Sequence, residues 1–537
     1  MWREPGTKSL FVPTTPLYLD AYIRQQDPEL HSQIQWSKIQ LLKRTRQQLI
    51  DDINASDADV VCVSLYIWNA VDILTQLKGI KAELKKPVTI VAGGPSAGIY
   101  NNRAWLDENP DVDFCVYTQG EVPFLDILRH VTNQKKISVL NTKNVAWKEN
   151  DKLKLADFEF LRKSGSHYLE SQHLLRQITS DPEYSHIKVF ELPYETSRGC
   201  TYACAFCDWT AGLTHKVSHR KSNWYEEWKL FGECNILYIH MSDANVGQVA
   251  EDLEVWQAMI DVKNDFGYQF KIYNSNFSKN QKVRAFEIID RLLAADILGR
   301  PKFAVQDTND EVLANIERPD IPWVQHKEFI MKMHDKYPGR NFQIELIMGL
   351  PGQTRKTWAK ALLDTSPFFT QPYKFIVLPD SPAGSKEYQE KMKMKVIKTN
   401  ILAVDYNFGN FDDTATFDSN LYDAVVETYS YTINDYAYFM LLDMAIGAPG
   451  LFPEAEDKAA VIDAINRCAF LEISLQKIAD HILNGTCEKI RYVVDFFMKL
   501  MLDNQKSQLP PEIVKKFIKF KMQQHKMVAY ATNKNEL

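Results

Sequence analysis

Two stretches of the 537-residue chain alternate strand-like runs with helix-length segments, and this rhythm constrains the fold more than any other feature. In the first stretch the strand-like runs are DVVCVSLYI, VTIVAGGP and VDFCVYTQG, and the segments between them carry apolar residues at helical spacing. Alternation of this kind produces a parallel sheet with helices on both faces. We therefore predict an α/β fold that begins with a doubly wound, Rossmann-like domain over residues 1–140.

A second α/β rhythm follows a polar connector, which we place at residues 141–188. Six strand-like runs occur in it: VFELPYETS, ILYIHMSDANVG, FKIYNSNFS, KFAVQDTND, FQIELIMGLPGQT and YKFIVLPDSPAGS. We interpret residues 189–395 as a partial (β/α)6 barrel of the TIM type. Polar residues or glycines end each run, and in such barrels the carboxyl ends of the strands form the active-site rim.

The remaining part, residues 396–537, has the apolar stripes of amphipathic helices, and we predict a C-terminal helical cap domain. No motif in it identifies a substrate. Two polar-aromatic stretches, NFGNFDD at 407–413 and VETYSYT at 426–432, are candidates for lining a pocket. Ordinary loop and helix packing is the alternative role for both stretches.

Composition excludes some classes of partner. The net charge of −6 is spread without long acidic or basic blocks, which argues against nucleic acid and favours a small-molecule or peptide substrate. The longest apolar run, at 438–452, is interrupted by Asp443 and Pro449, so we expect no membrane partner. Five cysteines stand singly in apolar patterns, which is the usual place for buried free thiols in a reducing compartment, and we expect a cytoplasmic protein. These are Cys62, Cys115, Cys234, Cys468 and Cys487.

The other three cysteines, Cys200, Cys204 and Cys207, form a C-x3-C-x2-C pattern within ETSRGCTYACAFCDW. A structural zinc site usually has four ligands, and His215 or His219 supplies the fourth in a Cys3His alternative. However, the cysteines directly follow the first predicted barrel strand, which directs their loop to the rim. A [4Fe-4S] cluster held by three cysteines leaves one iron open to a small molecule. Their number and position therefore favour the cluster.

The cysteine pattern, with Phe206 before its last member, resembles that of the radical S-adenosylmethionine (SAM) enzymes, in which the open iron binds SAM. The motifs SDANVG, VQDTNDEVLANIERPD, IMGLPGQT and VLPDSPAGS follow in the order seen in family members with an N-terminal cobalamin-binding domain. SLYIWN, VAGGPS and VDFCVYTQGEVPF look like that domain, and the resemblance covers about 55–390. It implies three cofactors: a [4Fe-4S] cluster, SAM and cobalamin.

The resemblance also implies which residues contact each cofactor. The three cysteines of the motif would bind the cluster alone. The SAM contacts would be Phe206, Asp243, Asn245, Asn274, Asn276, Gln306, Glu345 and Gly349. The cobalamin contacts would be Ser64, Tyr66, Trp68, Asn69, Gly93, Gly94, Pro95, Gly120 and Glu121. Structural roles are the alternatives for some of them: strand-end capping for Asp243 and Asn245, turn formation for Gly93 and Gly94, and packing for Trp68.

Three departures from the family pattern carry information. The D-x-H-x-x-G motif that supplies an axial histidine to cobalt in some cobalamin enzymes is absent, so we expect cobalamin to bind without a histidine ligand, with Tyr66 or Trp68 against its lower face. SDAN replaces the glycine-rich turn common after the second barrel strand, which would place Asp243 and Asn245 near the SAM amino group or ribose. Only SLFVP precedes TTPLYLDAYIR, so the first strand of the cobalamin domain is expected to be short or missing.

The function that the resemblance implies is that of a cobalamin-dependent radical SAM methyltransferase. A reduced cluster would cleave SAM to a 5′-deoxyadenosyl radical, that radical would activate an unactivated carbon, and methylcobalamin would supply the methyl group. The electrons would come from a donor such as flavodoxin or ferredoxin. The alternatives are other cobalamin-requiring radical reactions, including ring contraction, cyclisation and methylation at phosphorus, radical modification of RNA or a peptide, and a non-catalytic cobalamin- or metal-binding regulator. The sequence does not identify the substrate.

Overall fold

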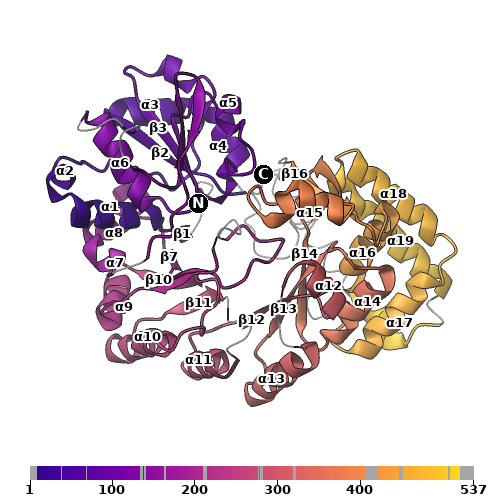
Figure 1. Cartoon of the computed structure of the whole chain (residues 1–537). Helices are drawn as coiled ribbons and strands as arrows, with labels where there is room; N and C mark the ends of the chain where they lie inside the picture. The colour runs from indigo at the N-terminus through magenta and orange to yellow at the C-terminus, as the bar shows by residue number, and fades with distance from the viewer. Residues whose placement is uncertain are drawn as a thin grey trace, which may run out of the picture. The chain divides into compact units, whose positions relative to one another are not determined.

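A computed structural model describes residues 9–37, 39–67, 69–133, 137, 141–162, 165–209, 214–275, 277, 282–318, 322–404, 421–446, 452–505 and 508–519. The chain divides into two compact units, which we describe separately (Figure 1). Unit 1 comprises residues 1–300 and 378–385, and unit 2 comprises residues 301–377 and 386–537. Two of the predicted site residues, Trp68 and Asn276, lie outside the described ranges, as does the NFGNFDD stretch.

The first sheet of unit 1 is the predicted Rossmann-like sheet. Its strands, in spatial order, are β2 (Val60–Ser64), β3 (Thr89–Gly93), β4 (Phe114–Val116), β5 (Val145–Glu149) and β6 (Lys152–Leu155). The first three are parallel, and β5 and β6 extend the sheet as an antiparallel edge. Strand side chains alternate between two faces, so Ile90 and Ala92 enter one apolar core while Val91 enters another.

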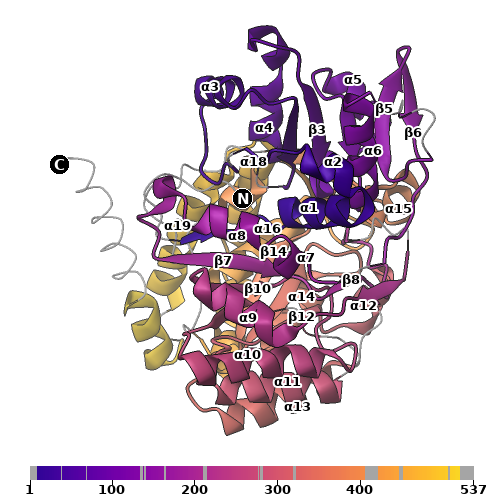
Figure 2. The same ribbon diagram turned by 90° about the vertical axis from the view of Figure 1, so that its left-hand side faces the viewer.

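Helices cover both faces of this sheet, which confirms the doubly wound arrangement (Figure 2). One core includes side chains from α3 (Arg46–Ser56), α4 (Ala70–Leu77) and α5 (Trp105–Glu108), and the opposite core includes α6 (Glu121–Val131). The outer side of α6 packs against α1 (Thr15–Gln26) and α2 (Pro28–Ser32).

The second sheet of unit 1 is parallel and contains the first three predicted barrel strands. Its order is β1 (Ser9–Phe11), β7 (Val189–Tyr194), β10 (Ile236–Met241) and β11 (Lys271–Asn274). The SLFVP run therefore forms β1 beside β7, with Leu10 opposite Phe190, and does not join the β2–β6 sheet.

Helices and a small hairpin complete the description of unit 1. The helices are α7 (His167–Glu170), α8 (Gln172–Thr179), α9 (Trp224–Glu233), α10 (Asp252–Phe266) and α11 (Lys282–Ala294), and the hairpin strands are β8 (Ser197–Gly199) and β9 (Val217–His219). One face of β7 packs on a buried aromatic group in which Tyr194 contacts Trp228, Phe231 and Trp256. These large apolar surfaces hold the barrel strands against α9 and α10.

Unit 2 contains the other three predicted barrel strands as a second parallel sheet. These are β12 (Lys302–Gln306), β13 (Gln343–Met348) and β14 (Phe369–Lys374), and the helices of this part are α12 (Asp310–Asn315), α13 (Trp323–Lys336) and α14 (Arg355–Asp364). All six predicted barrel strands thus form, each followed by helix, and the α/β class with barrel-type βα units is confirmed.

The rest of unit 2 is mainly helical, as predicted. It contains α15 (Lys386–Lys391), a β-ribbon of β15 (Lys395–Thr399) and β16 (Tyr422–Glu427), and the helices α16 (Ile433–Ile446), α17 (Ala455–Asn466), α18 (Leu471–Leu483) and α19 (Ile490–Gln505). Helix α16 is buried along nearly its whole length, because α14, α17, α18, α19 and β16 all contact it. The domain boundaries at 140, 188 and 395 stay a prediction.

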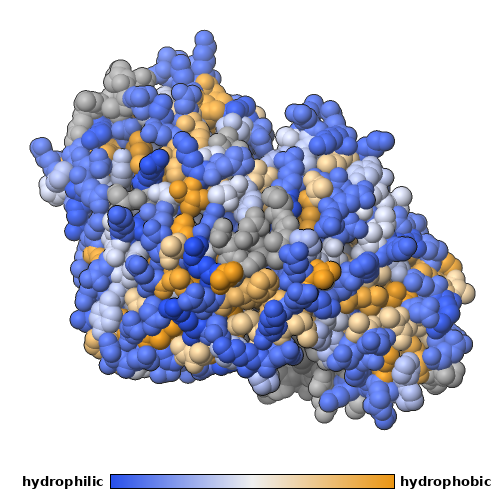
Figure 3. Space-filling view, turned by 60° about the horizontal axis from the view of Figure 1, so that its bottom comes forward, coloured by the Kyte–Doolittle hydropathy of each residue, from blue (hydrophilic) through white to orange (hydrophobic). Residues whose placement is uncertain are grey.

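The surface is polar, as the composition indicates. Hydrophilic side chains cover most of the face drawn in Figure 3, and apolar residues form smaller patches between them. Among the helices in the described part of the chain, none combines the length and the apolar character needed to cross a bilayer.

Gly94, in the turn after β3, cannot be replaced without strain. Its φ is +105°, and a Cβ there would lie 2.5 Å from the carbonyl oxygen of Leu65. We expect Gly94→Ala to cost about 1–3 kcal/mol because its φ of 105° and ψ of 168° lie in a region that essentially only glycine adopts, and about 1–3 kcal/mol more for the overlap. Gly267→Ala is the matched control, because its φ is +76° and nothing lies within 4 Å of its Cβ position.

Calorimetric unfolding of the two apoprotein variants measures this difference. Gly94→Ala should lower the unfolding temperature clearly more than Gly267→Ala does. Equal shifts in unfolding temperature for the two variants would contradict this expectation, because they would show that the turn after β3 can accommodate a side chain.

Candidate functional site

The cysteine loop begins directly after β8 in unit 1. Cys200 and Cys204 are buried and Cys207 is half-buried. The peptide N–H of Tyr202 donates a hydrogen bond to Cys200 Sγ at 3.4 Å, and that of Trp209 donates to Cys207 Sγ at the same distance. Hydrogen bonds to cluster-ligating sulfurs stabilise their negative charge and tune the reduction potential. The donor set and its N–H partners therefore fit an iron–sulfur cluster.

The three sulfurs are not gathered into a closed ligand set. Among the described side chains, no group of three or more His, Cys, Asp and Glu is placed to hold a metal ion. His219, one candidate for a fourth zinc ligand, lies 3.3 Å from Asp252 at the start of α10. The two facing atoms, His219 Nε2 and Asp252 Oδ1, are both buried and form no hydrogen bond with a described residue, so the Cys3His alternative stays open.

Asn245 links the second barrel strand to the cysteine loop. Its side-chain amide donates to Cys200 Sγ at 3.3 Å, while its Oδ1 atom is buried and accepts no hydrogen bond within the described structure. A buried acceptor without a partner is costly unless a ligand or water satisfies it. Asn245 is therefore suited to accept a hydrogen bond from a ligand bound beside Cys200.

Asp243 caps the turn that leads into the cysteine loop. Its carboxylate accepts hydrogen bonds at 2.7 Å from the N–H groups of both Thr196 and Ser197, and a third from the Thr196 hydroxyl. Burial raises the pKa of Asp243 to about 6. The structure thus shows the capping role that the sequence left open, and the SAM contact stays a prediction.

The other predicted SAM residues are distributed over several strand ends. Phe206 lies within the cysteine loop, and Asn274 is the last residue of β11. Gln306, Glu345 and Gly349 belong to unit 2: Gln306 ends β12, Gly349 directly follows β13, and Glu345 lies within β13 and not at the strand end where it was predicted.

Gln306 ends β12 in an unusual backbone conformation. Its φ is +72°, at an irregularity in the pairing of β12 with β13, and its buried Oε1 atom has no hydrogen-bond partner in the described part of the chain. Left-handed backbone in a residue with a side chain costs energy and is concentrated at functional sites. Both features favour a ligand-binding role for Gln306.

Gly349 is held by a side-chain network that the sequence analysis missed. Gln353 Oε1 accepts from the N–H groups of Gly349 and Leu350, and Gln353 Nε2 donates to Asp307 at 2.6 Å. A Cβ on Gly349, whose φ is +93°, would lie 2.9 Å from the ring of Tyr436. The glutamine of the GLPGQT motif is the sequence signal for this network, since an amide side chain beside a glycine-rich turn commonly closes it.

Glu345 lies on β13 within a polar group of side chains. Gln343 and Tyr373 donate hydrogen bonds to it at 3.2 and 3.3 Å, and Lys302 is 3.9 Å away. Burial raises its pKa, and the lysine charge opposes that effect. The structure supplies Glu345 with local partners, so its SAM contact stays a prediction.

The predicted cobalamin loop is a compact turn at the ends of β2 and β3. Asn69 closes it by accepting from the Tyr66 N–H at 2.7 Å and donating to the Ser64 carbonyl at 3.0 Å. The Leu65 N–H donates to the Gly93 carbonyl at 2.7 Å, which joins the ends of β2 and β3. Pro95 begins a short 3-10 turn at 95–97 directly after Gly94.

The face of edge strand β2 that carries Val60 packs on the α1 and α6 cores at its start, and it is exposed only towards the strand end. Cys62 and Ser64 point to this face and are both exposed, whereas most side chains of β3 and β4 are buried. Small side chains beside a glycine-rich strand end leave room for a ligand to approach the backbone. The residues present therefore fit a large bound group at this edge.

The end of β4 is connected to the cysteine loop by an ion pair. Gly120 precedes α6, and Glu121 is the first residue of that helix. The Glu121 carboxylate accepts from the guanidinium of Arg198, two residues before Cys200, at 2.6 Å. The sequence analysis assigned no role to Arg198, although an arginine directly before the first Gly-Cys pair was the available signal.

A second connection comes from the VLPDSPAGS motif, of which 378–385 belongs to unit 1. The Ala383 N–H donates to the Ala205 carbonyl, between two of the cysteines, at 2.9 Å. Asp380 accepts from the Asn101 N–H at 3.0 Å, in the segment after β3. This motif therefore joins the cysteine loop to the Rossmann-like sheet.

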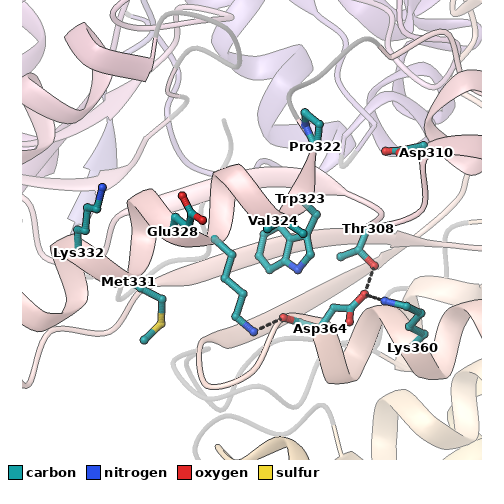
Figure 4. A pocket seen from close by; sticks show the side chains of 11 residues that line it. Thr308, Asp310, Pro322, Trp323, Val324, Glu328, Met331, Lys332, Lys360 and Asp364 are labelled. Atoms are coloured by element: carbon teal, nitrogen blue, oxygen red, sulfur yellow. Dashed lines mark hydrogen bonds and ion pairs between the residues drawn. The ribbon is translucent and has the colours of Figure 1, made fainter.

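Two pockets lie apart from the cysteine loop. In unit 2 a pocket of about 610 Å³ lies between α13 and the end of α14, where Thr308 and Lys360 bind the Asp364 carboxylate beside Trp323 (Figure 4). None of its lining residues was predicted to bind a cofactor. In unit 1 a smaller pocket of about 290 Å³ is lined by Tyr18 and Glu121 among others.

Comparison with protein-family models finds no match. Among curated proteins, the cobalamin-dependent radical SAM methyltransferase TokK of Streptomyces tokunonensis is 26% identical over 405 residues, which is 72% of this chain and 56% of TokK. The chain spans about half the length of the curated relatives that it matches first.

Two solved structures share the fold. The radical SAM methyltransferase TsrM from Kitasatospora setae, with cobalamin and a [4Fe-4S] cluster bound, matches with a TM-score of 0.54 at 12% identity over 88% of this chain and 97% of TsrM. The cobalamin-dependent radical enzyme OxsB, with aqua-cobalamin and SAM bound, matches with a TM-score of 0.54 at 14% identity over 98% of this chain and 79% of OxsB. These findings confirm the resemblance carried by the cysteine motif: the chain is similar in sequence to a cobalamin-dependent radical SAM methyltransferase and in fold to radical SAM enzymes solved with cobalamin bound.

Proposed function

We propose that this protein is a cobalamin-dependent radical SAM methyltransferase that acts on an unactivated carbon of a small molecule or peptide. The observation that carries the proposal is the cysteine loop, whose Cys200 and Cys207 sulfurs accept N–H hydrogen bonds beside the free buried acceptor of Asn245. The sequence match to TokK supports the reaction class. We place the protein in the cytoplasm, with an electron donor such as flavodoxin or ferredoxin.

In this proposal the domains have the boundaries given above: cobalamin domain 1–140, linker 141–188, radical SAM barrel 189–395 and helical cap 396–537. When bound, the cluster with SAM supplies a carbon-centred radical and cobalamin supplies the methyl group. The chain's own residues bind and orient these groups. Cys200, Cys204 and Cys207 would hold the cluster, and Asn245, which donates to Cys200, would offer its free Oδ1 to a hydrogen-bond donor of SAM.

The two cofactor sites draw on different strand ends of unit 1. Ser64 and the backbone around Gly93 line the exposed strand end where we place cobalamin, whereas Asn245 lies beside Cys200. Asp243 acts on SAM indirectly, because it holds the turn that sets the position of Cys200. Substitutions around Ser64 and Gly93 should therefore affect cobalamin binding, whereas substitution of Asn245 should affect SAM cleavage.

The first test removes the cluster ligands one at a time. Cys200→Ala, Cys204→Ala and Cys207→Ala should each abolish the [4Fe-4S] absorption and EPR signals and the reductive cleavage of SAM after anaerobic reconstitution. Cys234→Ala is the control, since Cys234 is a buried free thiol outside the motif, and it should keep both properties. Full cluster content in the three motif variants, or stoichiometric zinc in the purified protein, would refute the assignment.

The second test concerns the axial ligand of cobalt. Because the D-x-H-x-x-G motif is absent, we expect the cobalamin base to be displaced without a histidine in its place. EPR of the Co(II) form should then lack nitrogen superhyperfine coupling, and free cob(II)alamin with its own base coordinated is the positive control that shows this coupling. A clear axial-nitrogen signal from the protein alone would contradict the expectation.

The third test separates the two binding sites and the reaction class. Asn245→Ala should lower SAM cleavage at least about tenfold, since one lost hydrogen bond to a charged group is worth about 1.5–3 kcal/mol, with little change in cobalamin affinity. Tyr66→Ala should weaken hydroxocobalamin binding more than SAM cleavage.

The reaction class is read from the nucleosides formed when the reconstituted enzyme converts methyl-labelled SAM in a cell extract. Equal amounts of 5′-deoxyadenosine and S-adenosylhomocysteine per labelled product support methyl transfer. 5′-Deoxyadenosine without S-adenosylhomocysteine, alongside substrate conversion, would move the assignment to a non-methylating radical enzyme. An absence of SAM cleavage with intact cobalamin binding would favour the regulator.

A further inference from the structure

The segment before the first cysteine is held at every residue. Glu195 accepts from the Tyr18 hydroxyl at 2.5 Å, and the Asp243 carboxylate binds the next two N–H groups. Gly199, with φ +93°, packs so closely that a Cβ would lie 2.1 Å from the Lys216 carbonyl. Two side chains of this segment contact the Rossmann-like domain: Glu195 binds Tyr18 in α1, and Arg198 binds Glu121 at the start of α6.

Arg198 is a buried cation with a defined set of partners. Its side chain is 13% exposed, and that of Glu121, 2.6 Å away, is 9% exposed. Glu195 lies 3.7 Å away, and the guanidinium stacks over the Tyr18 ring at 5.3 Å. A charge pair buried in this way is strongly disrupted when one partner is removed, because the other charge is left without compensation.

Glu121 connects the ion pair to the β2–β6 sheet. Glu121 begins α6 after the short segment 117–120 that follows β4, so it belongs to the connection that leaves the carboxyl edge of the β2–β6 sheet. On the other side of the loop, Asp380 and Ala383 connect the segment after β3 to Ala205. The cysteine loop is thus attached to the ends of two neighbouring strands of one sheet.

We propose that Arg198 is a positioning residue, which through Glu121 fixes the cysteine loop at one distance from the sheet edge that binds cobalamin. The inference rests on the proposed function, because it concerns the spacing between the two cofactors. An arginine suits this position, because its planar guanidinium matches the geometry of a carboxylate and stays charged when it is buried. Reductive cleavage of SAM and methyl delivery act on one substrate, so their cofactors need a constant separation.

The test measures that separation in the holoenzyme without substrate. The protein is reconstituted with cluster and hydroxocobalamin and reduced to the [4Fe-4S]⁺ and Co(II) states, and the spin–spin distance is determined by pulsed EPR. The wild type should show one narrow distance distribution. Arg198→Met and Glu121→Gln should both broaden or shift it, and Arg198→Lys should restore it in part.

A matched control and a second readout distinguish positioning from general destabilisation. Glu233→Gln removes an exposed ion pair of the same unit, with Arg176 at 2.7 Å, and should leave the distance unchanged. The cluster midpoint potential should rise in Glu121→Gln, which leaves an uncompensated cation near Cys200, and fall in Arg198→Met. Loss of packing alone would not produce opposite shifts.

Failure of the inference and failure of the proposed function give different results. Wild-type protein that binds no cluster or no cobalamin would overturn the proposed function, and the inference with it. Wild-type distances and potentials in both Arg198→Met and Glu121→Gln, with both cofactors bound, would overturn only the positioning role. If Arg198→Met does not fold, Glu121→Gln and Arg198→Gln, which removes the charge but keeps a polar side chain, decide on the same criteria. A Glu121→Gln effect confined to hydroxocobalamin affinity, with Arg198→Met unchanged, would identify a direct cobalamin contact and also overturn the inference.

Discussion

Parallel strand pairing is the constraint on which the rest of the structure depends. When strands run in the same direction, their carboxyl ends meet at one edge of the sheet. The backbone N–H and C=O groups of each segment that leaves this edge then need hydrogen-bond partners outside the sheet. In unit 1 this places Ser64, Gly93 and Glu121 at one sheet edge, and Tyr194 and Met241 at the end of another. The cysteine loop starts from the second edge and is bonded to the first.

Polar residues at these strand ends fall into two groups by their hydrogen bonds. Asp243, Asn69 and Gln353 use their side-chain atoms to close turns. Asn245 and Gln306 instead keep a buried oxygen that accepts no hydrogen bond from any described residue. Because an unsatisfied buried acceptor is costly, the second group is the better guide to ligand contacts.

A buried arginine lies on each side of the cysteine loop in the sequence. After the loop, Arg220 is fully buried, donates to the Glu195 carbonyl at 2.9 Å and pairs with Glu227 in α9. Before the loop, Arg198 pairs with Glu121. Burial disfavours isolated charges, so each arginine is stable only with its carboxylate in place. The base of the cysteine loop is therefore bonded on one side to α9 and on the other side to α6 of the Rossmann-like domain.

Local pattern by itself determined the element types, the six barrel strands, the helical C-terminal part and the cysteine motif, because periodicity and turn residues depend on nearby sequence. Tertiary structure alone decided that β1 pairs with β7 and that Glu121 binds Arg198. It also decided that Asp243 closes a turn and that Gln353 bridges two strand ends. The sequence marks Arg198 and Gln353 as polar residues beside motifs, but their partners lie far away in the chain, and only the packing of the distant segments decides which polar groups are brought together.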